Sequence, residues 1–260
     1  MLLPLVPALV VKGLFWVLAL TVFLRLLARQ QDGVIDAHGR RLLGAVVLGV
    51  LAGSKLAYAI GYPDLVVDVS EADHAWFLAW LGGDSAPGAV VGGRVGLWIA
   101  DRGVRSTRLA DALVPPVGAA LLILCLGAFF WALRGADYGG PTGLPWGVDF
   151  GDGVARHPVM LYEALALAIV LARDRRFASA ATGAGERARQ FLLVYCAAGL
   201  ALGYLKGPFH RMLLPEAAAQ QPRIYASLMT AEQCLCATTI LVVLAAMWMS
   251  RVRSSLTPAE

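Results

Sequence analysis

Hydrophobic residues along the chain gather into seven runs, separated by charged or glycine-rich segments. The runs cover residues 3–24, 42–60, 86–100, 110–133, 158–172, 191–205 and 233–248. Because a bilayer core about 30 Å thick requires about 20 apolar helical residues, this pattern predicts about seven transmembrane helices. The expected fold class is an all-α polytopic membrane protein, with residues 1–260 forming a single transmembrane domain. Glycines interrupt the short third run, so we expect a tilted, re-entrant or broken segment there.

The composition supports a membrane protein. Of 260 residues, 58% are hydrophobic and only 15% are charged, whereas soluble domains carry about 25% charged residues. The net charge of +4 does not indicate nucleic-acid binding, because the basic residues lie at the ends of apolar runs and form no single patch. The four cysteines fall in apolar segments without C-x-x-C spacing. This pattern indicates neither a zinc site nor a disulfide framework, and we interpret them as small core residues.

Positive charge differs between the two sides of the predicted membrane. Fourteen arginines follow the first, third, fifth and seventh runs, and five basic residues follow the others. The positive-inside rule therefore predicts an outside N-terminus and a cytoplasmic C-terminus. On this topology the loops at about 61–85, 134–157 and 206–232 face outward.

One polar, turn-rich stretch, residues 135–165, leads directly into an apolar helix. Its many glycines and prolines exclude a long regular element and predict a loop with fixed turns. Arg156, His157 and Pro158 close this loop, since proline is favoured in the first turn of a helix. Glu163 is then a carboxylate near the mouth of an apolar helix, which makes it a functional candidate. Arg156 and His157 are its nearest possible partners in the sequence.

Three basic residues, Lys12, Lys55 and Arg94, lie inside the apolar runs. A base in lipid is costly unless it faces a polar cavity, a carboxylate or a lipid headgroup. Lys12 could instead extend to the outer interface, since it comes early in its run. Lys55, Arg94 and Arg156 together would make an electropositive pocket suited to an anionic phospholipid. The alternative is that these bases only pair with Glu163 or with backbone carbonyls.

Two motifs suggest a family. Residues 138–148 read Y-G-G-P-T-G-L-P-W-G-V, and Arg156-His157-Pro158 is followed by Leu161, Tyr162 and Glu163. This pair resembles the outward loop and following helix of the bacterial prolipoprotein diacylglyceryl transferase family, W-G-x-P-T-x-L-P-W-G-V and R-H-P-x-Q-L-Y-E. Weaker similarity appears in G-S-K-L-A-Y at 53–58, in G-G-x-x-G at 92–96, and at Met229 with Gln233. The resemblance implies a multi-pass protein of the bacterial plasma (inner) membrane.

The resemblance also implies a reaction. Family members move a diacylglyceryl group from phosphatidylglycerol to the lipobox cysteine of prolipoproteins, without a metal or other cofactor; a closely related phospholipid-dependent transfer is included in this expectation. Such a transfer needs cations for the departing phosphate, an acceptor for the thiol proton, and a cavity open to lipid. The catalytic candidates are Glu163, His157 and Arg134. The substrate-binding candidates are Arg156, Tyr162, Gly139, Pro141, Thr142, Lys55 and Arg94.

Several family positions are changed in this chain. Val91 stands where the family has histidine, residues 128–136 lack the arginine, asparagines and glutamate of R-x-G-N-F-x-N-G-E, and residues 203–207 lack the ends of R-F-x-x-E. Lys12 stands in place of a tyrosine. A neutral valine cannot transfer a proton or bind phosphate.

Nearby charged residues could replace the missing groups. By proximity and charge the candidates are Arg134, Asp137 and Lys206. The alternative is a catalytically altered or inactive paralogue that binds phospholipid or a membrane partner without modifying lipoproteins. An unrelated transporter is disfavoured, because the two halves show no internal repeat.

Overall fold

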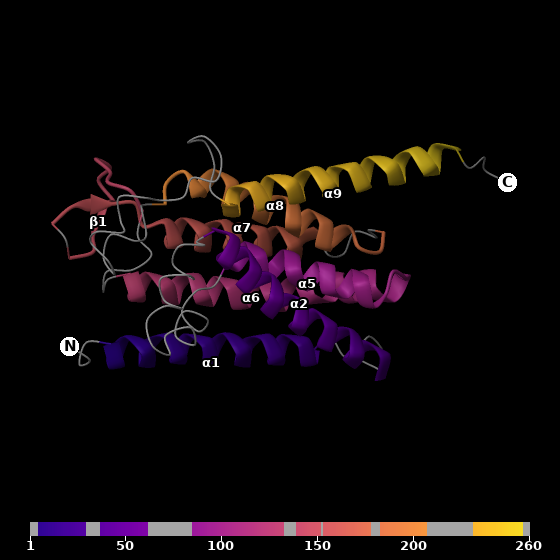
Figure 1. Ribbon diagram of the computed structural model, residues 1–260, viewed down its shortest axis with the longest axis horizontal. Coiled ribbons are helices and arrows are strands. Elements are labelled where there is room, and N and C mark those ends of the chain that lie inside the picture. Colours follow the sequence, from indigo (N-terminus) through magenta and orange to yellow (C-terminus); the bar gives the residue numbers. More distant parts are fainter. Residues whose placement is uncertain are drawn as a thin grey trace.

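The computed structural model describes residues 5–29, 37–61, 85–132, 139–151, 153–177, 183–206 and 231–256. Within these ranges the chain is helical apart from one short hairpin. The seven helices are α1 (Leu5–Arg29), α2 (Ala37–Gly61), α5 (Ala86–Ala100), α6 (Val104–Ala132), α7 (Val159–Phe177), α8 (Glu186–Gly203) and α9 (Ala231–Leu256). They lie side by side and successive helices run back and forth, with the hairpin at one end of the bundle and the end of α9 at the other (Figure 1).

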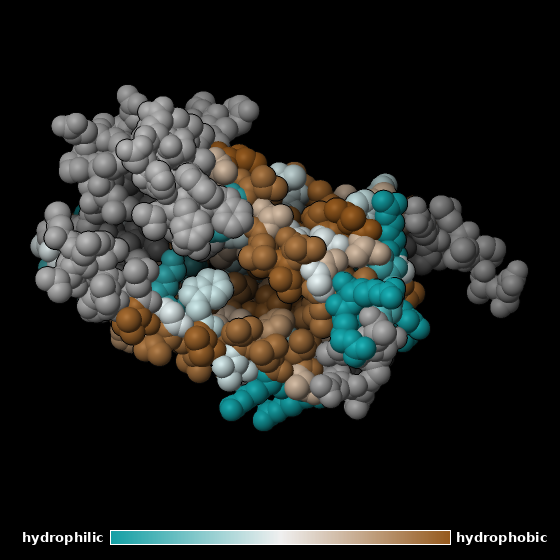
Figure 2. All heavy atoms as spheres, turned by 60° about the horizontal axis from the view of Figure 1, so that its bottom comes forward, coloured by the Kyte–Doolittle hydropathy of each residue, from teal (hydrophilic) through white to brown (hydrophobic). Residues whose placement is uncertain are grey.

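Each predicted apolar run coincides with one helix, so the all-α class is confirmed. Four helices, α1, α2, α6 and α9, contain stretches long and apolar enough to cross a membrane, judged by length and composition. Hydrophobic residues cover most of the described surface in Figure 2, and a recess lies between them. So large an apolar surface would be unfavourable in contact with water, so the exposed apolar side chains are suited to contact with lipid. Seven spans and their orientation remain predictions.

Of the alternatives expected for the third run, a broken helix is wrong, because α5 is continuous; a tilted or re-entrant course remains a prediction. The glycines of α5 permit close packing against α2. A Cβ on Gly92 would collide with the Gly49 carbonyl and lie 2.7 Å from the Gly53 Cα. Glycines spaced by four residues share one helix face, and such small residues let two membrane helices approach closely. The glycines therefore mark a helix–helix contact.

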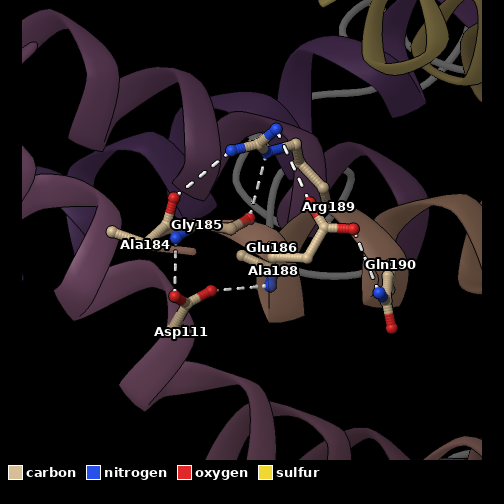
Figure 3. A network of polar contacts seen from close by, with 7 residues as sticks. All are labelled: Asp111, Ala184, Gly185, Glu186, Ala188, Arg189 and Gln190. Atoms are coloured by element: carbon tan, nitrogen blue, oxygen red, sulfur yellow. Dashed lines mark hydrogen bonds and ion pairs between the residues drawn. The ribbon is translucent and has the colours of Figure 1, made fainter. Parts of the chain in front are cut away.

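The end of the bundle away from the hairpin is held by a polar network around the start of α8 (Figure 3). Asp111 of α6 accepts hydrogen bonds from the Gly185 N–H at 2.6 Å and the Ala188 N–H at 2.9 Å. A carboxylate satisfies the unpaired N–H groups there and complements the helix dipole. Arg189 donates to the Gly185 carbonyl and pairs with Glu186 at 3.6 Å. These contacts join α6 to α8.

The predicted loop with fixed turns is a hairpin of two short strands, β1 (Val148–Asp149) and β2 (Ala155–Arg156), paired antiparallel. In the turn, Asp149 Oδ1 accepts from the N–H groups of Gly151 and Gly153 at 2.8 and 3.1 Å. Both glycines have positive φ, 104° and 74°, which other residues rarely adopt. Much of the predicted outward loops, residues 62–84 and 207–230, lies outside the described residues.

Candidate functional site

A cavity of about 470 Å³ lies between the helices, and all seven described helices contribute to its wall. This volume is in the range of about 300–1,000 Å³ found for small-molecule sites. Most lining residues are apolar. The polar side chains on the wall include those of Lys12, Ser54, Lys55, Tyr58, Ser85, Cys125, Glu163, Tyr195, Lys206, Glu232, Gln233 and Cys236.

Lys206 occupies the centre of a charged cluster on this wall. Its Nζ lies 3.1 Å from Glu163 Oε1 on α7 and 3.6 Å from Glu232 Oε2 on α9. The Cys125 thiol of α6 donates to Glu163 Oε2 over 3.9 Å. Glu163 therefore pairs with a lysine that is distant in sequence, and its recorded partners do not include the neighbouring Arg156 or His157. Pairing with carboxylates offsets part of the cost of placing an ammonium group in an apolar wall.

The turn after α8 carries Lys206 to this position. Gln233 Nε2 of α9 donates to the Leu200 carbonyl at 3.0 Å, which satisfies one of the last carbonyls of α8. This contact requires Gly203, since a Cβ there would lie 2.6 Å from Gln233 Cγ. The Leu205 N–H then bonds to the Leu202 carbonyl at 2.9 Å as the chain leaves the helix. The Lys206 backbone is thus set by contacts between α8 and α9.

The start of the hairpin loop holds the same turn from the other side. Gly139 forms an antiparallel bridge with Lys206, and the Gly140 N–H donates to the Leu205 carbonyl at 2.8 Å. The Gly139 N–H donates to the His157 carbonyl at 3.0 Å. A Cβ on Gly139 would collide with that carbonyl, so only glycine fits. The hairpin therefore positions Lys206 through backbone contacts.

Two other motif residues also act through the hairpin backbone. Pro141 forms a bridge with Arg156. The Thr142 N–H donates to the Ala155 carbonyl at 2.8 Å, and Thr142 Oγ1 accepts from the Leu144 N–H at 3.2 Å. Gly139, Pro141 and Thr142, predicted to bind substrate, thus shape the loop that borders Lys206.

Aromatic side chains fasten the hairpin to α7. Trp146 Nε1 donates to the Tyr162 hydroxyl at 2.9 Å, and His157 Nδ1 lies 3.4 Å from the same hydroxyl. Pro158 precedes the helix, and its carbonyl accepts from the Leu161 N–H, as expected for a proline at a helix start. Trp146, Tyr162 and His157 are not among the described residues that line the cavity.

The structure brings only some of the predicted basic residues together. Lys12 and Lys55 line the cavity with Lys206, whereas Arg94 and Arg156 are not among its described lining residues. Arg94 interacts electrostatically with Arg189 and Asp111, two residues of the network drawn in Figure 3. Of the three residues predicted to form one pocket, Lys55, Arg94 and Arg156, only Lys55 is among the described residues that line this cavity. Two further candidates, Arg134 and Asp137, lie outside the described residues.

Three positions at which the chain departs from the family motifs, Lys12, Ala128 and Gly203, line the cavity. One of these changes supplies a lysine, and Lys206, at an unconstrained position of R-F-x-x-E, supplies another. Sequence reasoning missed Glu232, because an acid in the first turn of a helix is an ordinary feature of soluble and membrane helices alike. The available signal was that Glu232 directly precedes Gln233, which resembles a family motif residue. No three described His, Cys, Asp or Glu side chains come together in a way that could hold a metal ion.

Apolar helices packed around a cavity that contains a charged cluster define an α-helical membrane protein with an internal polar site. Comparison with known proteins identifies the family. The sequence model described as prolipoprotein diacylglyceryl transferase matches residues 8–249. The chain belongs to this family, and the resemblance predicted from its motifs is confirmed.

Individual relatives match part of the chain. A phosphatidylglycerol–prolipoprotein diacylglyceryl transferase of Streptomyces griseus is 35% identical over 159 residues, covering 56% of this chain and 47% of that protein. Proteins of the same name from Geobacter sulfurreducens and Nitratidesulfovibrio vulgaris strain Miyazaki F are each 34% identical, over 143 and 129 residues. These matches cover 54% and 48% of this chain, and 51% and 47% of the relatives. The chain spans about half the length of the curated relatives it matches.

Proposed function

We propose that this protein transfers a diacylglyceryl group from phosphatidylglycerol, or a closely related anionic phospholipid, to the lipobox cysteine of prolipoproteins. The relatives described above are named for this activity. The observation that supports it in this chain is the cluster of Lys206 with Glu163 and Glu232 on the wall of an apolar cavity. This cluster places a cation that can bind the phosphate beside carboxylates that can accept the thiol proton.

The charge of the cavity favours an anionic donor. Its described lining residues include three lysines, Lys12, Lys55 and Lys206, and two glutamates, Glu163 and Glu232. The formal balance is therefore one positive charge, which a phosphodiester with one negative charge would neutralise.

The chemistry follows from these groups. The acceptor sulfur attacks the glyceryl carbon that bears the phosphate ester, and the carbon–oxygen bond to phosphate breaks. Glycerol phosphate leaves with the bonding electrons, and positioned cations stabilise the negative charge that develops on it. The thiol must give up its proton to a nearby base. The apolar wall would hold the acyl chains and keep out water that would otherwise hydrolyse the donor.

We further propose that the seven helices cross the bacterial plasma membrane with the N-terminus outside. The four long apolar helices and the charge distribution support this topology. The hairpin and Lys206 then lie toward the outer leaflet, where a lipobox cysteine would arrive. The whole chain would form one transmembrane domain.

Transfer of label from diacylglyceryl-labelled phosphatidylglycerol to a lipobox peptide, by the purified protein in nanodiscs, tests this function. We expect wild-type turnover and a loss of about 100-fold or more in Glu163→Gln, a size typical of lost electrostatic stabilisation. Glu186→Gln is the matched control, since Glu186 lies at the other end of the bundle in the network of Figure 3. Wild-type protein that binds phosphatidylglycerol but transfers no label would contradict the proposal.

A further inference from the structure

We propose that Glu232 accepts the proton of the incoming thiol, while Lys206 binds the departing phosphate and Glu163 holds Lys206 in place. This inference rests on the proposed function and assigns separate roles to the two carboxylates. Glu232 lies outside the family motifs that this chain resembles.

The two carboxylates differ in their contacts. Both oxygens of Glu163 are engaged, Oε1 with Lys206 at 3.1 Å and Oε2 with the Cys125 thiol at 3.9 Å. Glu232 contacts Lys206 through Oε2 at the longer distance of 3.6 Å. Glu163 is therefore suited to hold the lysine, and Glu232, with the longer contact, is the carboxylate that more easily leaves the lysine to take a proton.

Phosphate binding would increase this difference. An ammonium group attracted to a phosphate gives up its weaker contact first, and the longer contact is the one with Glu232. A carboxylate that loses its cation in an apolar cavity binds a proton more readily. Donor binding would thus prepare Glu232 to act as a base only when the phospholipid is in place.

The atoms balance in one displacement. The thiol proton passes to Glu232 as the sulfur–carbon bond forms and the carbon–oxygen bond to phosphate breaks. The bonding electrons leave with glycerol phosphate, whose charge Lys206 neutralises together with Lys12 and Lys55 of the same cavity. The proton on Glu232 then passes to the leaving phosphate or to water, which restores the carboxylate.

His157, the histidine predicted as a catalytic candidate, is less well placed. Its Nδ1 lies 3.4 Å from the Tyr162 hydroxyl, and it does not belong to the described lining residues of the cavity. Glu232 is itself a lining residue whose side chain keeps 20% of its surface exposed. The carboxylate, not the imidazole, can therefore meet a thiol inside the cavity.

The test compares two acceptor peptides that differ in one atom, a lipobox peptide with cysteine and the same peptide with selenocysteine. A selenol is ionised at neutral pH and needs no base, whereas a thiol does. We expect Glu232→Gln to lower kcat for the cysteine peptide about 100-fold or more, the usual range for losing a general base. Its kcat for the selenocysteine peptide should stay within about five-fold of wild type, and its KM for phosphatidylglycerol should not change.

The companion variants separate the two roles. Glu163→Gln should lose activity with both peptides, because it acts through Lys206 on the phosphate. Glu232→Asp keeps a carboxylate and should retain part of the activity with the cysteine peptide. That result would show that position 232 tolerates substitution. Glu186→Gln should match wild type with both peptides.

Each remaining outcome decides the inference. If Glu232→Gln equals wild type on the cysteine peptide, or loses both peptides equally, Glu232 is not the base and the proposed function still stands. If the wild-type protein transfers label to neither peptide, the proposed function fails and this inference fails with it.

Discussion

Gln233 Nε2 donates a hydrogen bond to the Leu200 carbonyl over 3.0 Å, which joins the start of α9 to the end of α8. Gln233 is buried and lines the cavity. Because the carbonyl is one of the last four of its helix, it depends on a donor from outside the helix. The bond therefore fixes the turn that carries Lys206 to the two glutamates.

Replacing Gln233 with Ala should destabilise the protein by about 1–3 kcal/mol, the cost of leaving a buried carbonyl without its donor. It should also slow transfer, because Lys206 would no longer be held at its present position. Thermal unfolding in detergent and the transfer assay measure the two effects. Gln190→Ala is the control, since Gln190 is exposed and bonds only to Glu186 at 3.0 Å among the contacts recorded. Equal effects in both variants would contradict the assignment.

Gly139→Ala should disturb the loop that borders Lys206. The added Cβ would collide with the His157 carbonyl and lie 2.8 Å from the Leu205 carbonyl. We expect transfer to slow about tenfold, equivalent to about 1.4 kcal/mol, and proteolysis of the hairpin to become faster. Gly143→Ala provides the matched comparison, because nothing lies within 4 Å of a Cβ there. A normal rate in Gly139→Ala would show that the hairpin does not position the site.

Lys55 and Arg94 should behave differently, although both were predicted to bind the donor. Lys55 lines the cavity, whereas Arg94 interacts with Asp111 and Arg189. Lys55→Met should raise KM for phosphatidylglycerol about tenfold, through loss of about 1.4 kcal/mol of binding. Arg94→Met should leave the KM for phosphatidylglycerol unchanged, measured on the folded fraction of the variant. If KM rises more in Arg94→Met than in Lys55→Met, Arg94 binds the lipid headgroup and this prediction is wrong.

The contact between α2 and α5 should be sensitive to a single methyl group. Gly92→Ala would place a Cβ against the Gly49 carbonyl and force the helices apart, at a cost of about 1–3 kcal/mol. Gly44→Ala on α2 meets nothing within 4 Å and should be neutral. Thermal midpoints of the two variants in nanodiscs make the comparison. Similar midpoints would mean that the helices do not pack this closely.

Asp111→Ala should lower stability without changing donor binding. It removes the acceptor for the Gly185 and Ala188 N–H groups at the start of α8, a loss that typically costs about 1–2 kcal/mol. Glu186→Gln, which removes only the pair with Arg189 at 3.6 Å, should cost less than about 1 kcal/mol. Chemical or thermal unfolding measures the difference, and KM for phosphatidylglycerol should be the same in both. A raised KM in Asp111→Ala would show that the network reaches the cavity.

Local and additive properties could be predicted from the sequence. The number and positions of the helices follow from hydrophobic runs, because each span must be apolar by itself in lipid. The turn-rich loop follows from its glycines and prolines, although its two paired strands do not. Glu163 stands out because a carboxylate at a helix mouth is costly. The family follows from motifs that are contiguous, such as residues 138–148 and 156–163.

Only the tertiary structure decided which charges meet. Lys206 reaches Glu163 and Glu232 because the start of α7, the end of α8 and the start of α9 lie side by side, and no pattern within one helix specifies that neighbour. The same limit explains why Arg94 was grouped with Lys55 in one predicted pocket, and why the glycines of α5 were interpreted as marking a tilted, re-entrant or broken segment. Glycine spacing defines a face of a helix, whereas the partner on that face depends on how the whole bundle packs. Interactions between distant segments are a property of the packed bundle, so the charged cluster could be recognised only after the helices were placed.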